Sequence, residues 1–92
     1  MVMSKLKRRV IFTEQASTEL DTLRPDEQRA VLHNVGLVAN DQNPYTRLRK
    51  LKNDAGWNLR AGRIRVWIIQ DDNGQLCVTR VERRSRAYRR GS

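Results

Sequence analysis

Arginine is the main side chain of this sequence that could act on a bound ligand, and it is unevenly distributed. The 92 residues include 19 lysines and arginines and 10 acids, for a net charge of +9. Residues 1–45 hold six basic and six acidic side chains. Residues 46–92 hold thirteen basic and four acidic ones, and eleven of those thirteen are arginine. Because the arginine fork grips phosphate in a bidentate manner, the second half predicts a nucleic-acid partner more than a solvated surface of mixed charge.

Catalysis in this basic half would depend on arginine, lysine and tyrosine side chains. Positioned cations stabilise the charge that develops at phosphorus during cleavage of a phosphodiester. Arginine is a poor proton carrier because its pKa lies above ~12, so proton transfer would fall to Tyr88, Lys50 or Lys52. Tyr88 could instead stack on an unpaired base or close the sheet as an aromatic cap. Trp57 and Trp67 are expected to pack.

Other kinds of catalytic site lack the residues they need. His33 is the only histidine, which excludes a nuclease built on a histidine pair. Cys77 is the only cysteine, so an internal disulfide and a multi-cysteine zinc site are both excluded. Asp71 and Asp72 stand alone at a turn, and no glycine-rich phosphate loop is present. We therefore expect neither a metal nor a cofactor.

Hydropathy argues against a membrane or secreted protein. The longest apolar run, residues 66–69, has four residues, whereas a spanning helix needs about 20. The first residues lack the hydrophobic region of a signal peptide. No linker, repeat or low-complexity segment interrupts the chain, so we expect one cytoplasmic domain over residues 1–92.

The first half predicts a strand followed by two helices. Residues 9–12 have the composition of a strand, and Thr13 is a suitable N-cap for a helix over residues 14–23. Pro25 suits the first position of a second helix. The two helices form a hairpin that is expected to cover a sheet. The apolar stripe of the second helix is Val31, Val35 and Val38.

The second half predicts strands at residues 56–60, Ile64–Gln70 and 76–82. Residues 61–62 form the first turn, and Asn73-Gly74 is a strong hairpin signal between the last two strands. A two-residue turn there pairs Asp72 with Gln75, and hence Ile68 with Thr79, Trp67 with Arg80 and Arg65 with Glu82. The face toward the helices would hold Ile64, Val66, Ile68, Cys77, Thr79 and Val81. The opposite face would hold Arg63, Arg65, Trp67, Ile69, Val78 and Arg80.

Three motifs, in this order, resemble those of the RelE/ParE toxin superfamily. They are residues 50–53 (Lys-Leu-Lys-Asn), residues 57–66 (Trp-Asn-Leu-Arg-Ala-Gly-Arg-Ile-Arg-Val) and residues 81–88 (Val-Glu-Arg-Arg-Ser-Arg-Ala-Tyr). The resemblance covers nearly the whole chain, and the middle motif is the most specific. It implies an α+β fold, in which a small antiparallel sheet packs against the N-terminal two-helix hairpin.

The RelE branch of this superfamily implies an mRNA interferase. Such a toxin enters the ribosomal A site and cleaves mRNA without a metal, with the RNA's own 2′-hydroxyl as the nucleophile. By motif position, Arg65 and Arg84 would hold and neutralise the scissile phosphate, and Tyr88 would orient a base or assist proton transfer. The other basic residues would bind RNA and the ribosome; they are Lys50, Lys52, Arg60, Arg63, Arg80, Arg83, Arg86, Arg89 and Arg90.

The sequence also departs from the motifs of this branch. Gly56 and Asn58 occupy strand positions that are lysine in some ribosome-dependent members, which leaves the general base to Lys50, Lys52 or Arg60. The departures elsewhere are Ile64 for the usual tyrosine and Arg83 for a frequent histidine.

The resemblance implies partners and leaves two other functions open. A cognate antitoxin would cover the arginine-rich face with an acidic or groove-filling segment, and the pair would bind operator DNA. One alternative is a ParE-like toxin that inhibits DNA gyrase by binding. The other is a noncatalytic RNA-binding module whose arginines follow a phosphate backbone.

Overall fold

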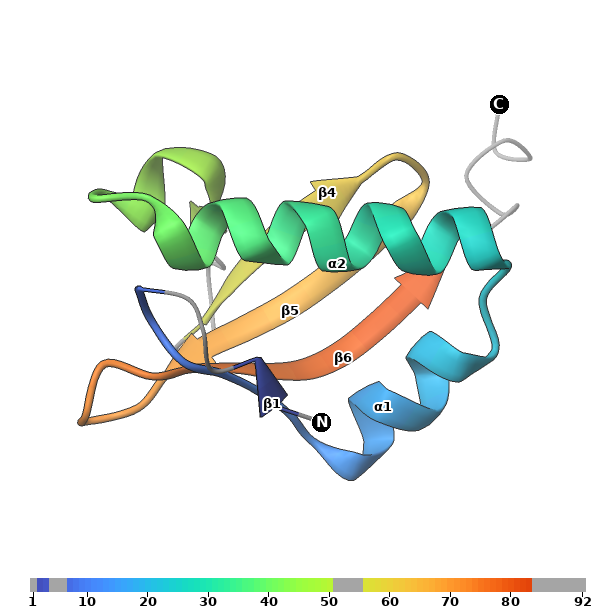
Figure 1. Cartoon of the computed structure of the whole chain (residues 1–92), viewed down its shortest axis with the longest axis horizontal. Coiled ribbons are helices and arrows are strands. Elements are labelled where there is room, and N and C mark those ends of the chain that lie inside the picture. The colour runs from blue at the N-terminus through green and yellow to red at the C-terminus, as the bar shows by residue number, and fades with distance from the viewer. Residues whose placement is uncertain (1, 4–6, 51–55, 84–92) are drawn as a thin grey trace.

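The computed structural model describes residues 2–3, 7–50 and 56–83 and shows a sheet with helices on one face (Figure 1). The sheet has six strands in the order β1-β2-β6-β5-β4-β3. Figure 1 shows α2 lying across the sheet, where it packs on β4 and β5, while α1 packs on β6. The elements are β1 (Val2–Met3), β2 (Val10–Phe12), α1 (Glu14–Asp21), α2 (Pro25–Asn40), the 3-10 helix η1 (Pro44–Arg47), β3 (Arg49–Lys50), β4 (Trp57–Ala61), β5 (Ile64–Gln70) and β6 (Leu76–Arg83).

Both helices begin where the sequence predicts. The Thr13 hydroxyl accepts a hydrogen bond from the backbone N–H of Ala16 (3.1 Å), which is the bond expected of an N-cap. Pro25 opens α2, and the Glu27 carboxylate accepts from the backbone N–H of Arg24 (3.0 Å). The first helix is shorter than predicted, because it ends at Asp21.

The sheet is mixed, which corrects the prediction that it is antiparallel throughout. The neighbouring strands β2 and β6 run parallel, and the other four pairings are antiparallel. Tight turns impose antiparallel neighbours, whereas strands far apart in sequence are free to pair in parallel. Two α-helices, the 3-10 helix and three strands separate β2 from β6. The predicted α+β class, with a sheet packed against two N-terminal helices, is confirmed.

The β5–β6 hairpin differs from the prediction in its turn. The backbone N–H of Asp71 donates to the Gln75 carbonyl (3.0 Å), so the loop has three residues, ending in Gly74 at φ +83°. A three-residue loop of this kind ends in a residue of left-handed conformation, which glycine adopts without strain. The longer loop shifts the register by one, so that Ile68 pairs with Val78 instead of Thr79.

A β-bulge then restores the predicted register. The irregularity lies between Trp67 and Ile68, beyond which Trp67 pairs with Arg80 and Arg65 pairs with Glu82, as predicted. On the loop side of the bulge the two faces of β6 are exchanged: Val78 is fully buried, and Cys77 and Thr79 are half-buried. The prediction that Cys77 and Thr79 face the helices is therefore wrong, and so is the outward position of Val78.

One apolar core lies between the helices and a single face of the sheet. The buried residues of β5 alternate with half-buried or exposed ones, so the opposite face of this strand is uncovered by the helices. No helix among the described residues is both long and apolar enough to span a membrane. The buried core residues are Val10, Phe12, Ala16, Leu20, Leu23, Val31, Val35, Val38, Ala39, Leu59, Ala61, Ile64, Val66, Ile68, Leu76, Val78 and Val81.

Candidate functional site

The sheet face opposite the helices carries two rows of side chains that cross the strands. In the first row, Arg60 of β4 lies directly opposite Arg65 of β5, which lies opposite Glu82 of β6. Opposed residues of neighbouring strands have Cβ atoms ~4.5–5.5 Å apart, so the two arginines present their charge to the same ligand position. The structure thus brings together Arg65 and Arg60, two of the basic residues singled out in the sequence.

The second row places Trp67 in the middle of this face. Trp67 lies opposite Asn58 on β4 and Arg80 on β6, and Arg49 of β3 lies on the far side of Asn58. The guanidinium carbon of Arg80 is 5.2 Å from the centre of the Trp67 ring, and that of Arg65 is 6.0 Å away. Cations at these distances are attracted by the ring. Trp67 therefore orients two arginines in addition to packing.

Arg80 is also tied to acidic neighbours. It forms an ion pair with Glu82 (3.0 Å) and a longer one with Glu19 of α1 (4.0 Å). The other Glu19 carboxylate oxygen accepts from the backbone N–H of Val81 (2.7 Å), which takes the place of a strand partner on that edge of β6. Exposed ion pairs of this kind contribute little to stability, but they restrict where the Arg80 side chain lies.

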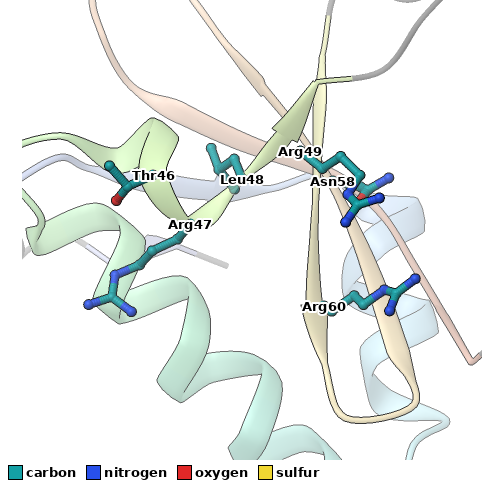
Figure 2. Close-up of a pocket in the computed structure, with 6 residues that line it drawn as sticks. All are labelled: Thr46, Arg47, Leu48, Arg49, Asn58 and Arg60. Carbon is teal, nitrogen blue, oxygen red and sulfur yellow. The ribbon is translucent and has the colours of Figure 1, made fainter.

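A groove lined by three arginines continues from the first row to the β3 edge of the sheet. Its volume is about 230 Å³. Figure 2 shows the side chains of Arg49 and Arg60 directed to the same side, while Arg47, from η1, points away from them. Arg47 is held by Asp41 (3.0 Å). Among the described residues, neither Arg49 nor Arg60 forms an ion pair. The lining residues are Thr46, Arg47, Leu48, Arg49, Asn58 and Arg60.

The groove lining contains no acidic side chain; Asp41 balances the charge of Arg47 from outside it, and no ion pair among the described residues balances Arg49 or Arg60. The guanidinium groups of Arg49 and Arg60 in one lining repel each other unless an anion binds near them. Arginine binds phosphate oxygens through paired N–H groups, which makes a phosphodiester the matching ligand.

Lys50 lies apart from this arginine-rich face. Its ammonium nitrogen is 4.6 Å from the centre of the Trp57 ring. Lys50 lies opposite Trp57, which in turn lies opposite the buried Ile68, so both belong to the helix side of the sheet. The ring of Tyr45 packs against Trp57 at 5.1 Å. Trp57 packs as expected, and the structure does not bring Lys50 next to Arg65.

Arg83 also points away from the uncovered face. Its guanidinium donates two hydrogen bonds to the Glu27 carboxylate at the start of α2, at 2.5 and 3.3 Å. The hydrogen bond from Arg83 is the main cause that lowers the pKa of Glu27 below its usual 4.5, and it also raises the pKa of Arg83. The pair ties the end of β6 to α2.

The ion pair between Glu27 and Arg83 makes a contribution to the free energy of unfolding that depends on pH. Because the pKa of Glu27 is lower in the folded chain, the contribution is present above the usual carboxyl pKa and is lost as the pH falls through the lowered value. We expect Arg83→Gln to be less stable than the parent chain at neutral pH, with the difference vanishing in acid. Denaturant unfolding of both proteins between about pH 2 and pH 7 measures this, and a difference independent of pH would contradict it.

The remaining sequence-predicted residues divide into two groups. Arg63 is an exposed turn residue between β4 and β5, since the two-residue turn is Gly62-Arg63, one residue later than predicted. Gly62 has φ +66°, which suits the first central position of such a turn. Six candidates lie outside the described residues; they are Lys52, Arg84, Arg86, Tyr88, Arg89 and Arg90.

Two side chains of the uncovered face were not among the predicted site residues, although Asn58 was noted as a departure from the motif. Arg49 lines the groove because β3 pairs with β4, and Asn58 separates Arg49 from Trp67. The excess of arginine after residue 45 included Arg49, but a two-residue strand has no sequence pattern of its own.

Neither a thiol nor a metal site adds to this arrangement. Burial, with a smaller effect of Asp71, raises the pKa of the Cys77 thiol, so it is protonated at neutral pH and weakly nucleophilic. Within residues 2–3, 7–50 and 56–83, no three His, Cys, Asp or Glu side chains cluster closely enough to hold a metal ion.

Comparison with solved structures shows that the fold of this chain is a known one. The chain is similar to a structure of the toxin–antitoxin complex RelBE2 from Mycobacterium tuberculosis, with a TM-score of 0.75 and 24% identity over 86% of this chain and 93% of that one. The chain has a RelE-like fold. No protein-family model matches the sequence, and no curated protein matches it significantly.

Two archaeal structures share the RelE-like fold. The RelE–RelB complex from Pyrococcus horikoshii gives a TM-score of 0.70 at 19% identity, over 88% of this chain and 99% of that one. The RelB–RelE complex from Methanococcus jannaschii gives 0.68 at 15% identity, over 89% and 99%. The RelE-like fold is thus retained at low identity, and the side chains of the uncovered face must be interpreted from this sequence itself.

Proposed function

We propose that this chain is the toxin of a type II toxin–antitoxin pair and a metal-independent endoribonuclease that cleaves mRNA in the ribosomal A site. The observation that carries the proposal is the opposed pair Arg60 and Arg65 on the uncovered face, continuous with the groove that Arg49 lines. The RelE-like fold, seen in three toxin–antitoxin complexes, supports the same function. The motif resemblance of residues 57–66 supports it independently.

The proposed chemistry needs charge stabilisation more than a protein nucleophile. The ribose 2′-oxygen attacks the adjacent phosphorus and loses its proton, and the bond from phosphorus to the 5′-oxygen breaks. This leaves a 2′,3′-cyclic phosphate, and a proton is delivered to the departing 5′-oxygen. Arg65, with Arg84 by motif position, neutralises the charge that builds up on the phosphate oxygens. Tyr88, by motif position, orients a base or assists the proton transfer.

The proposed partners follow from the same charge. An antitoxin with an acidic segment would cover the arginine-rich face and suppress cleavage, and the complex would bind operator DNA. The ribosome and its mRNA are the proposed targets, and the proposed location of the toxin is therefore the cytoplasm.

Primer extension on a translated message tests the proposal. Expression of the chain in a translating extract should produce cuts within codons, which are absent when the same RNA is offered without ribosomes. Inhibition of DNA supercoiling without cuts would instead support the ParE-like alternative. RNA binding without cuts would support the noncatalytic module.

The groove makes a prediction about binding that does not depend on cleavage. We expect Arg49→Gln with Arg60→Gln to weaken binding to single-stranded RNA and to reduce the slope of log K against log salt by about 1 to 2, since each lost phosphate contact contributes ~0.7. Fluorescence titration at several salt concentrations measures this. A matched control is Arg24→Gln with Arg29→Gln, which removes the same charge from exposed positions at and near the start of α2. Equal slopes for the two double variants would exclude the groove as a phosphate site.

A further inference from the structure

A second basic cavity lies beside the β5–β6 loop, at the end of β5 that is farther from Arg65. Its volume is about 350 Å³. At the left of Figure 1, the loop and the segment that precedes β2 lie near the end of α2. Arg65 stands five residues from Gln70 along β5, or about 16 Å at ~3.3 Å per residue. The lining residues are Lys7, Arg8, Arg9, Gln70, Asn73, Gly74 and Gln75.

The basic side of this cavity is held rigidly. Arg8 donates from its backbone to the Ala39 carbonyl (3.0 Å), and its guanidinium donates to the carbonyls of Asp41 and Gln42 at the end of α2. The Ala39 carbonyl, to which the guanidinium also donates (3.5 Å), is one of those that a helix end leaves without helical partners, at the negative end of the helix dipole. With Arg8 so anchored, Lys7 and Arg9 are exposed on either side of it. Neither forms an ion pair among the described residues.

The loop side of the cavity is polar and also rigid. The Asp71 carboxylate accepts from the backbone N–H groups of Asn73 and Gln75 and from the Gln75 side-chain amide, each at 2.9 Å. Asp71 is thus turned into its own loop and is not part of the lining. The Gln75 side-chain oxygen is buried and has no hydrogen-bond donor in the described part of the chain. The wall therefore offers amide groups next to three cations, and one of its residues, Gln75, holds an unpartnered acceptor that is buried.

The chemistry of this lining fits an RNA backbone. Lysine and arginine bind phosphate oxygens, and side-chain amides bind sugar or base edges. An unused acceptor calls for a donor, and the ribose 2′-hydroxyl, which DNA lacks, is a donor beside every phosphate of RNA. A small movement of Gln75 would turn its oxygen to such a hydroxyl. An acidic peptide also carries carboxylates and backbone N–H donors, so it is the competing ligand in the test below.

We propose that this cavity is a second RNA-binding site, through which the chain holds folded ribosomal RNA while Arg65 acts on the message. The proposal rests on the proposed function, because only a ribosome-dependent enzyme needs a remote contact with the particle. Binding energy from groups remote from the reacting bond is what positions that bond in the catalytic site. Naked mRNA cannot supply a folded partner at both sites, which accounts for the dependence on ribosomes.

The test uses a double variant, Lys7→Gln together with Arg9→Gln, which we call the cavity variant. Its control is the double variant Arg24→Gln together with Arg29→Gln. Both are made in the full chain carrying Arg65→Ala. We expect the cavity variant to bind purified ribosomes about tenfold or more weakly than the control, with a salt slope smaller by about 1 to 2. With Arg65 restored, the cavity variant should need about tenfold more ribosomes than the control to reach half of its maximal cleavage rate, because ribosome binding is what the cavity contributes. Equal ribosome affinity and slope for the two variants would overturn the proposal.

Two further measurements distinguish the possible ligands. A folded RNA hairpin should bind the parent chain more tightly than a DNA hairpin of the same sequence, and Gln75→Leu should narrow that difference. A loss of affinity in the cavity variant for an acidic peptide but not for ribosomes would assign the cavity to a protein partner and overturn the RNA site. If the parent chain binds ribosomes but cuts no message, the proposed nuclease activity is wrong. The ribosome affinities of the cavity variant and the control still show whether this second site binds RNA.

Discussion

Arg65→Ala is expected to lower the rate of message cleavage on translating ribosomes by about 10²–10³, while the chain stays folded. Arg65 lies on β5, which pairs along its length with β4 and β6, and on the face that the helices leave uncovered. A donor fixed on such a strand is already in position when charge builds up on the phosphate, so its removal slows the chemical step. Single-turnover cleavage at saturating ribosomes measures that step directly.

Two variants separate loss of this donor from loss of charge. Arg65→Lys keeps the charge but lacks the planar fork, so we expect partial activity between those of the parent and the alanine variant. Arg29→Ala removes a cation from an exposed position on α2 and should cleave like the parent. Circular dichroism and thermal unfolding establish that each variant is folded. If folded Arg65→Ala keeps full toxicity, the phosphate is stabilised elsewhere, and the noncatalytic and gyrase-binding alternatives gain support.

Much of this site could be predicted because strand alternation is a local property. Three buried residues of β5 alternate with Arg65, Trp67 and Ile69, so the sequence alone places these three on one face. The starts of the helices were equally predictable, since Thr13 and Pro25 act on the backbone next to them. In both cases the signal lies within a few residues of the feature it determines.

Features that depend on distant pairings could not be predicted in this way. The parallel pairing of β2 with β6 joins residues more than 60 positions apart, and no local pattern encodes its direction. The groove exists because the two residues of β3 pair with β4, which places Arg49 in the same lining as Arg60. Arg83 was expected to bind RNA from its charge, whereas the structure pairs it with Glu27, 56 positions away. Charge composition shows which half of the chain carries the excess of arginine, but it does not give the partner of each arginine.

The β5–β6 hairpin shows how two local choices can compensate for each other. Asn73-Gly74 indicates a two-residue turn, but the Asp71 carboxylate binds the N–H groups of Asn73 and Gln75 and favours a loop of three residues. The added residue would place every β6 side chain on the wrong face if the bulge did not remove the shift before Arg80. With a three-residue loop, the alignment of Arg80 with Trp67 and of Glu82 with Arg65 therefore requires the bulge.

Val78→Asp is expected to prevent folding, and it tests this register. Val78 is fully buried against the helices, where an unpaired carboxylate costs several kcal/mol, a large part of the 5–15 kcal/mol that typically holds a domain folded. Under the two-residue turn Val78 would point outward and tolerate the change. The milder Val78→Ala should lower the free energy of unfolding by about 2 kcal/mol, from ~0.8 kcal/mol per buried methylene and the cavity left behind.

The matched control is the neighbouring residue on the other face of β6. Cys77 is half-buried, so Cys77→Asp should leave a cooperative unfolding transition, and Cys77→Ala should cost less than Val78→Ala. Chemical denaturation of the two alanine variants, with heteronuclear NMR spectra of the two aspartate variants, gives the comparison. The reverse order of sensitivity would restore the two-residue turn and remove the bulge. It would leave Arg80 opposite Trp67, since both registers share that pair, but it would place Cys77 and Thr79 in the core and leave Val78 beside Arg65 and Trp67 on the proposed RNA-binding face.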